Sequence, residues 1–250
     1  MTTIYVDGAC KGNHLPGKLR SAGAGVYVDR ERDSAPRALP VSKKDAANCD
    51  PLLQPNAPLS RFAWRSLPSL AQQEASGQSG VPVTNNRAEL IATLMALEIV
   101  QKFGARLDAP ITIVTDSELL FNAVTKWLPG WRRNNFCKRD GKPVANQLLV
   151  RALDELLEAT RSYAIAWRHM NSHRREPENR ASAAWRAWHG NGAADRLANW
   201  ACTKALSTAT VRGAPRHRSR VAAPGRRAPV GARKRKPRTS LRRILSRLKL

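Results

Sequence analysis

The sequence has little of what several protein classes require. No run of 18 apolar residues is present, so a membrane-spanning helix is not expected. The four cysteines, Cys10, Cys49, Cys137 and Cys202, show no paired spacing, so neither a zinc site nor a disulfide framework is indicated. We expect reduced thiols in an intracellular protein. The first residues predict a strand, which leaves no room for a cleavable signal or transit peptide.

Acidic residues are scarce as well. The chain has 19 Asp and Glu against 43 Lys and Arg, which gives a formal net charge of +24 at pH 7. Residues 212–250 contain fifteen Lys and Arg and no acidic residue, so residues 1–211 keep a net charge of +9. Such an excess favours a polyanionic partner. We expect the chain to bind nucleic acid, partly through this basic tail.

The composition divides the chain into two parts. Residues 1–208 contain enough aliphatic and aromatic residues to predict one folded domain, in which residues 31–80 hold insertions or loose loops. Residues 209–250 are rich in Arg, Pro, Ala and Gly and predict a tail that is disordered when free. Residues 240–250 have Leu and Ile at helical spacing, which suggests a short amphipathic helix formed on contact with a partner. The segment RKRKPR at 233–238 resembles a nuclear import sequence, and otherwise we expect a cytoplasmic protein.

Hydrophobic periodicity predicts alternating strands and helices. The predicted strands are 4–6, 22–29, 60–67, 111–115 and 163–167. One predicted helix is capped by Asn85 or Asn86 and runs to about residue 103; the others are 117–127, 144–160 and 191–206. Residues 174–190 predict an extended loop that contains Arg and Trp, with at most a helical turn. This order indicates an α/β fold in which helices cover both faces of a mixed sheet.

Four acidic residues stand in four separate motifs. Asp7 lies in IYVDGACKGN, Glu89 in TNNRAEL, Asp116 in ITIVTDSE and Asp195 in GNGAADRLA. Any one of them alone is more simply explained as structural, because acidic residues complement helix N-termini. Together, at strand ends and helix starts, they are expected to meet and form a cage for two divalent metal ions, which suits phosphodiester cleavage.

These motifs resemble those of the type 1 ribonuclease H family. The resemblance covers about residues 1–30 and 81–206 and also includes AGAGVYV, which resembles the second strand of eukaryotic members. It implies an RNase H-like fold with a five-stranded mixed sheet, and a metal-dependent endoribonuclease that cuts the RNA strand of RNA–DNA hybrids. It implies two Mg²⁺ ions, with Mn²⁺ as an alternative. Glu89 and Asp116 would hold the ion on the attacking-water side, Asp7 would bridge both ions, and Asp195 would complete the second site.

The resemblance also implies residues that contact the substrate. WRHMNSH resembles the stretch that carries the family's mobile histidine, which places that histidine at His173 and gives it a role in proton transfer or product release; His169 is expected to be structural. Asn13, Asn85 and Asn86 would read 2′-hydroxyls. Trp127 and Trp131 would flank the DNA strand, and Thr84 and Asn146 would bind its phosphate.

The sequence also departs from the family. Pro82 stands where the phosphate pocket usually has a basic residue, and the stretch from His173 to Asp195 is longer than usual. That stretch could add substrate contacts or move His173 away from the metals. Two alternatives stay open: a catalytically impaired nucleic-acid-binding protein on the same fold, or another nuclease or recombinase of this superfamily. We expect a monomer.

Overall fold

The protein was analysed as a computed structural model that describes residues 1–12, 20–31, 61–67, 82–172 and 174–211. Asn13, His173, most of the predicted insertion 31–80 and the tail 212–250 lie outside the described residues. In the described part, no helix is long and apolar enough to cross a membrane. Cys10, Cys137 and Cys202 are free thiols.

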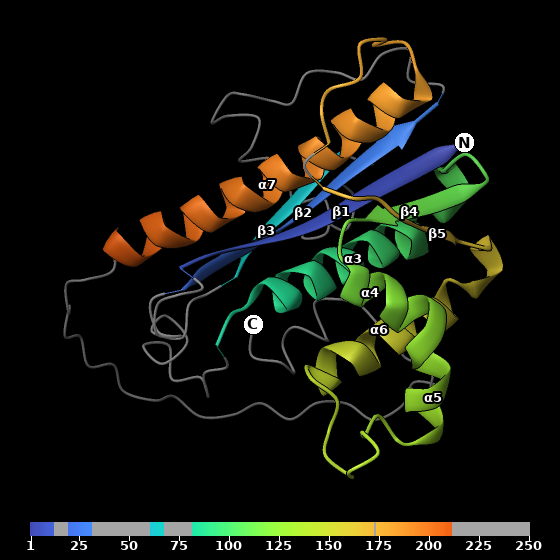
Figure 1. The fold of residues 1–250 in the computed structure, drawn as a ribbon, viewed down its shortest axis with the longest axis vertical. Coiled ribbons are helices and arrows are strands. Elements are labelled where there is room, and N and C mark those ends of the chain that lie inside the picture. The colour runs from blue at the N-terminus through green and yellow to red at the C-terminus, as the bar shows by residue number, and fades with distance from the viewer. Residues whose placement is uncertain (13–19, 32–60, 68–81, 173, 212–250) are drawn as a thin grey trace, which may run out of the picture.

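Five strands form one mixed sheet (Figure 1). They are β1 (Thr2–Lys11), β2 (Ser21–Arg30), β3 (Phe62–Leu67), β4 (Ile111–Thr115) and β5 (Ala166–His169). Their order is β3-β2-β1-β4-β5; β1, β2 and β3 pair antiparallel, whereas β4 runs parallel to β1 and β5 parallel to β4. The predicted five-stranded mixed sheet is confirmed.

Helices cover both faces of this sheet. The long ones are α3 (Asn85–Phe103), α6 (Gln147–Ala159) and α7 (Ala183–Val211). The shorter ones are η2 (Gly104–Arg106), α4 (Glu118–Asn122), η3 (Ala123–Trp127), α5 (Leu128–Arg133) and η4 (Arg161–Tyr163). Figure 1 shows α7 along one face and α3, α4 and α6 on the other.

The core follows from strand alternation. Successive side chains of a strand point to opposite faces, so Ile4 and Val6 enter the larger core with α3 and α6, whereas Tyr5 packs with Tyr27 in a smaller core under α7. Asp7 has the same parity as Tyr5 and is therefore on the α7 face. The carboxylate of Asp7 thus lies on the same face of β1 as Tyr5, at the edge of the smaller core.

Two glycines allow helices on opposite faces to approach the strands. A Cβ on Gly8 would lie 2.1 Å from the backbone N of Glu89, so α3 can cross β1 only because that position has no side chain. A Cβ on Gly25 would lie 2.3 Å from the backbone O of Ala194 in α7. Gly25 is also the register partner of Asp7. The close contacts therefore bring Glu89 and the residue after Ala194 towards the same point on β1.

The extended loop predicted for residues 174–190 is wrong in its second half, because α7 begins at Ala183. The Ser182 hydroxyl accepts a hydrogen bond from the backbone N of Trp185 at 3.0 Å, which caps the helix. Arg186 donates to Asp29 of β2 at 2.9 Å, so the first turns of α7 are tied to the sheet. Tertiary contacts thus extend a helix that the local composition does not indicate.

Two other boundaries shift for local reasons. The predicted helix 144–160 begins at Gln147, since Asn146 has a φ of 55° in the left-handed region. The predicted helix 117–127 is α4 followed by a π-helical turn that continues into α5, which has Pro129 in its first turn. The first shift places Asn146 at the N-cap of α6 instead of inside the helix, and the second places Trp127 at the end of the π-helical turn.

Candidate active site

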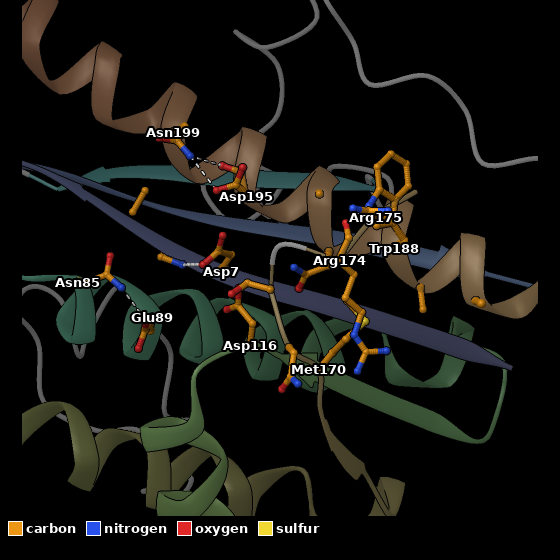
Figure 2. Close-up of a pocket in the computed structure, with 18 of the residues that line it drawn as sticks. Asp7, Asn85, Glu89, Asp116, Met170, Arg174, Arg175, Trp188, Asp195 and Asn199 are labelled. Atoms are coloured by element: carbon orange, nitrogen blue, oxygen red, sulfur yellow. Dashed lines mark hydrogen bonds between the residues drawn. The ribbon is translucent and has the colours of Figure 1, made fainter. Parts of the chain in front are cut away.

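The four predicted carboxylates line one pocket of about 590 Å³. Asp7 comes from β1, Glu89 from the first turn of α3, Asp116 from the residue after β4 and Asp195 from α7. Figure 2 shows them in the middle of the pocket, with Asn85 at one end and Arg174, Arg175 and Trp188 at the other. The predicted convergence of these side chains is what the fold produces.

Hydrogen bonds fix the carboxylates of Asp7 and Glu89. The backbone N of Gly8 donates to Asp7 Oδ1 at 2.6 Å. Asn85 Nδ2 donates to Glu89 Oε1 at 2.7 Å, and the Ser117 hydroxyl donates to Glu89 Oε2. The Glu89 side chain therefore has a defined orientation before any ligand binds. Asn85, predicted as a substrate contact, is at the same time a positioning residue for Glu89, and exposed Asn86 follows it.

The other two carboxylates are held from α7. Asn199 Nδ2 donates to Asp195 Oδ1 at 2.8 Å, four residues along the same helix (Figure 2). The Asn191 side chain, also on α7, opposes the rise in the pKa of Asp116. His169 Nε2 lies 3.1 Å from the backbone O of Asp116, a contact that supports the structural role expected of this histidine.

The electrostatics of the pocket favour the binding of a cation. Burial raises the pKa of Asp7 to about 8, with further contributions from the negative charges of Asp116 and Asp195 and an opposing one from the Gly8 hydrogen bond. Burial also raises the pKa of Glu89 and of Asp116. Converging oxygen donors with disfavoured negative charge are the chemistry that a hard divalent cation compensates.

The predicted metal cage is nevertheless open. In the described ranges, no three Asp, Glu, His or Cys side chains form a group compact enough to hold an ion by themselves. Mg²⁺ keeps several water ligands and is usually anchored by one or two carboxylates together with substrate phosphates. The donor set therefore fits such an ion, with part of its ligands left to water and substrate. The side chains enclose the site less tightly than the predicted cage.

A buried arginine joins two residues that sequence analysis predicted as a phosphate pocket. The Thr84 hydroxyl caps α3 by accepting from the backbone N of Arg87 at 3.3 Å, and Arg87 Nη1 donates to Asn146 Oδ1 at 3.4 Å. Arg87 is only 7% exposed, and burial lowers the pKa of its guanidinium. Sequence analysis missed Arg87, although it stands inside TNNRAEL; its guanidinium is a basic group next to Thr84 and Asn146, where Pro82 offers none.

The predicted aromatic pair lies together on the surface. The Trp127 and Trp131 ring centroids are 5.6 Å apart; Trp127 is 40% exposed, and Trp131 packs against the larger core. Exposed basic side chains follow at Arg133, Lys138, Arg139 and Lys142; of the basic residues here, Lys142 pairs with Asp140 at 3.7 Å and Arg132 with Asp154 at 2.7 Å. Trp127 therefore lies on the surface, and Trp131 lies partly in the core.

Two predicted residues cannot be placed. Asn13 and His173 lie outside the described residues. Ser172 and Arg174, on either side of position 173, both line the pocket. The added length between the histidine and Asp195 therefore does not carry these flanking residues away from the carboxylates.

The sheet order, the helices on both faces and the acidic pocket define the class of RNase H-like proteins. The RNase H family model matches residues 55–203, more than half of the chain. Ribonuclease H of Cyanothece sp. is 36% identical over 173 residues, which are 69% of this chain and 78% of that protein. Ribonuclease H of Thiobacillus denitrificans is 38% identical over 109 residues, 43% of this chain and 67% of that protein.

Solved structures agree at the level of the fold. The solution structure of the PFV RNase H domain has a TM-score of 0.51 and 20% identity, covering 81% of this chain and 94% of that domain. The foamy viral protease-reverse transcriptase, solved with an RNA/DNA hybrid, has a TM-score of 0.52 and 19% identity over 81% of this chain and 20% of that one. This chain belongs to the RNase H family, as the type 1 motifs predict, and is a hydrolase of the ribonuclease H class.

Proposed function

We propose that this chain is an endonuclease that hydrolyses the RNA strand of RNA–DNA hybrids with two Mg²⁺ ions. The observation that carries the proposal is the convergence of Asp7, Glu89, Asp116 and Asp195 on one pocket. The raised pKa values of Asp7, Glu89 and Asp116 and the oxygen-only chemistry of the four side chains support a divalent cation rather than a protein cation as partner. Mn²⁺ offers the same chemistry and is the alternative ion.

Each carboxylate has a proposed part. Glu89 and Asp116 would hold the ion on the side of the attacking water, Asp7 would bridge both ions, and Asp195 would complete the second site. When bound, such ions would activate a water and stabilise the leaving oxygen. The hydrogen bonds from Asn85 and Ser117 keep Glu89 oriented, and the one from Asn199 does the same for Asp195. Proton transfer or product release by His173 rests on the sequence alone.

The surroundings of the pocket suit a hybrid. Thr84, Arg87 and Asn146 offer hydroxyl, guanidinium and amide groups for a phosphate of the DNA strand. Trp127 and Trp131 present an aromatic surface for the same strand. Asn85 keeps its Oδ1 to accept from a 2′-hydroxyl, and Asn86 and Asn13 are proposed to read further ones. The chain is proposed to act as a monomer.

Asp116→Asn tests the proposal. The amide keeps the size of the side chain and removes the charge, so we expect cleavage of a labelled hybrid with Mg²⁺ to fall at least a thousandfold, while hybrid affinity persists. Glu158→Gln is the matched control, because Glu158 is an exposed acid that forms a surface ion pair with Arg161. Undiminished cleavage by Asp116→Asn would remove Asp116 from the mechanism.

A substrate panel separates the alternatives. Wild-type protein is incubated with RNA–DNA hybrid, duplex RNA or duplex DNA, with Mg²⁺, Mn²⁺ or EDTA. We expect cleavage of the hybrid alone and none with EDTA. Binding without cleavage would favour the catalytically impaired protein, and cleavage of duplex DNA would favour another nuclease of the superfamily.

A further inference from the structure

The pocket extends beyond the carboxylates. Its far end is lined by Arg174, Arg175 and Pro177 of the segment that precedes α7, and by Ala187 and Trp188 of α7 itself. Figure 2 shows Arg174, Arg175 and Trp188 opposite Asn85, across the acidic residues. We name residues 174–182 the pre-α7 segment. Guanidinium groups and carboxylates therefore share the walls of one cavity.

The four arginines of this region fall into two pairs. Arg180 pairs with Glu176 at 3.1 Å, and Arg186 pairs with buried Asp29 at 2.9 Å. Arg174 and Arg175 are exposed, and in the described part of the chain neither forms an ion pair. Arg180 and Arg186 therefore stabilise the structure, whereas Arg174 and Arg175 present their charges to the pocket.

Hydrogen bonds fix the pre-α7 segment in place. Trp188 Nε1 donates to the backbone O of Arg174 at 3.0 Å, and Trp185 Nε1 donates to Glu176 Oε1 at 3.0 Å. Both tryptophans belong to the part of α7 that Arg186 ties to β2. The backbone next to Arg174 is thus anchored to the sheet, which lowers the entropy lost when its side chain binds a ligand.

The two arginines are poorly explained as counter-ions of the carboxylates. In the described part of the chain, neither arginine forms an ion pair with one of the four carboxylates. A guanidinium matches the geometry of a phosphate and is weakly hydrated. An anion that enters the pocket from solvent is the partner this arrangement suits.

We propose that Arg174 and Arg175 form a phosphate-binding site for the RNA strand next to the bond that is cut. The inference rests on the proposed function, since it takes the strand at the carboxylates to be RNA. The site offsets the repulsion between the acidic pocket and the polyanion on the side away from Asn85. The longer connection before α7 is in this view a substrate-binding element of this chain.

The test compares two double variants of the full chain. Arg174→Ala with Arg175→Ala removes the proposed site, and Arg161→Ala with Arg106→Ala removes the same charge from exposed side chains of η4 and η2. Hybrid affinity is measured in the Asp116→Asn background over a range of salt. We expect the first double variant to bind about tenfold more weakly and its log–log salt slope to flatten by about 1 to 2. The control should match the parent.

Cleavage kinetics and a modified substrate complete the test. In the wild-type background, the first double variant should raise KM and leave kcat nearly unchanged. Neutral methylphosphonates in the DNA strand should leave the ratio of the affinities of parent and variant unchanged. If this ratio falls to one, the arginines contact the DNA strand and not the RNA strand. Equal salt slopes in both double variants overturn the arginine site, whereas a wild-type protein that fails to cut hybrid overturns the proposed function instead.

Discussion

At the residue scale, the ionised carboxylate of Asp7 lowers the stability of the folded state. Its side chain is 8% exposed, and burial together with neighbouring acids raises its pKa to about 8. The folded state therefore disfavours the ionised form. Relative to the unfolded chain, the stabilisation is complete below about pH 4 and is lost as the pH rises through about 8. A bound divalent cation reverses this loss, because it favours the carboxylate.

Asp7→Asn should therefore stabilise the metal-free protein while it abolishes cleavage. The amide oxygen can still accept from the Gly8 N, but no charge has to be buried. We expect a higher Tm than wild type in EDTA at pH 8, with a gain of a few kcal/mol at most, since one pKa unit is about 1.4 kcal/mol. The gain should shrink towards pH 4. Asp140→Asn, an exposed acid, is the control; a gain independent of pH would show that packing, not charge, is responsible.

The residues that carry the chemistry could be predicted better than those that position them. Asp7, Glu89, Asp116 and Asp195 were found because each stands in a distinctive motif. Asn199 lies four residues after Asp195 and could have been found from helical spacing. Ser117, by contrast, reaches Glu89 across 28 residues of chain, a contact that no local pattern encodes.

At the scale of elements, Asp29 of β2 connects the start of α7 to the sheet. It accepts from Arg186 at 2.9 Å and from Arg61 at 3.4 Å, and its side chain is 7% exposed. Strands and most helices followed from hydrophobic period, but the first eight residues of α7 did not. This segment contains three Ala, two Trp and one Arg, and its place in the fold is fixed by the Ser182 cap and by the distant carboxylate of Asp29.

Asp29→Asn should loosen this connection. It removes the charge that two arginines share in a largely buried place, so we expect a loss of about 1–3 kcal/mol in the free energy of unfolding, measured with urea. Glu31→Gln is the control, since Glu31 is exposed and pairs with the N-terminus. A change in the midpoint no larger than that of the control would mean that α7 is held by apolar packing alone.

At the scale of the whole molecule, the charge is divided between a moderately basic folded part and a strongly basic tail. Deleting residues 212–250 removes fifteen cations. Because phosphate neutralisation releases counterions, we expect KM for the hybrid to rise and its salt dependence to flatten, while kcat stays nearly unchanged. Cleavage assayed between low and physiological salt measures both. An unaltered salt slope would mean that the tail contributes no affinity.

The length of α7 sets the distance between the carboxylates and the residue at which the tail begins. From Asp195 to Val211 the helix continues for sixteen residues, about 24 Å at 1.5 Å per residue. That offset equals roughly seven base pairs at about 3.4 Å each. A duplex that is centred on the carboxylates and runs along α7 would therefore have to extend about seven base pairs to one side to reach the end of the helix. Oligonucleotide hybrids of increasing length should show tail-dependent affinity only once they exceed this span.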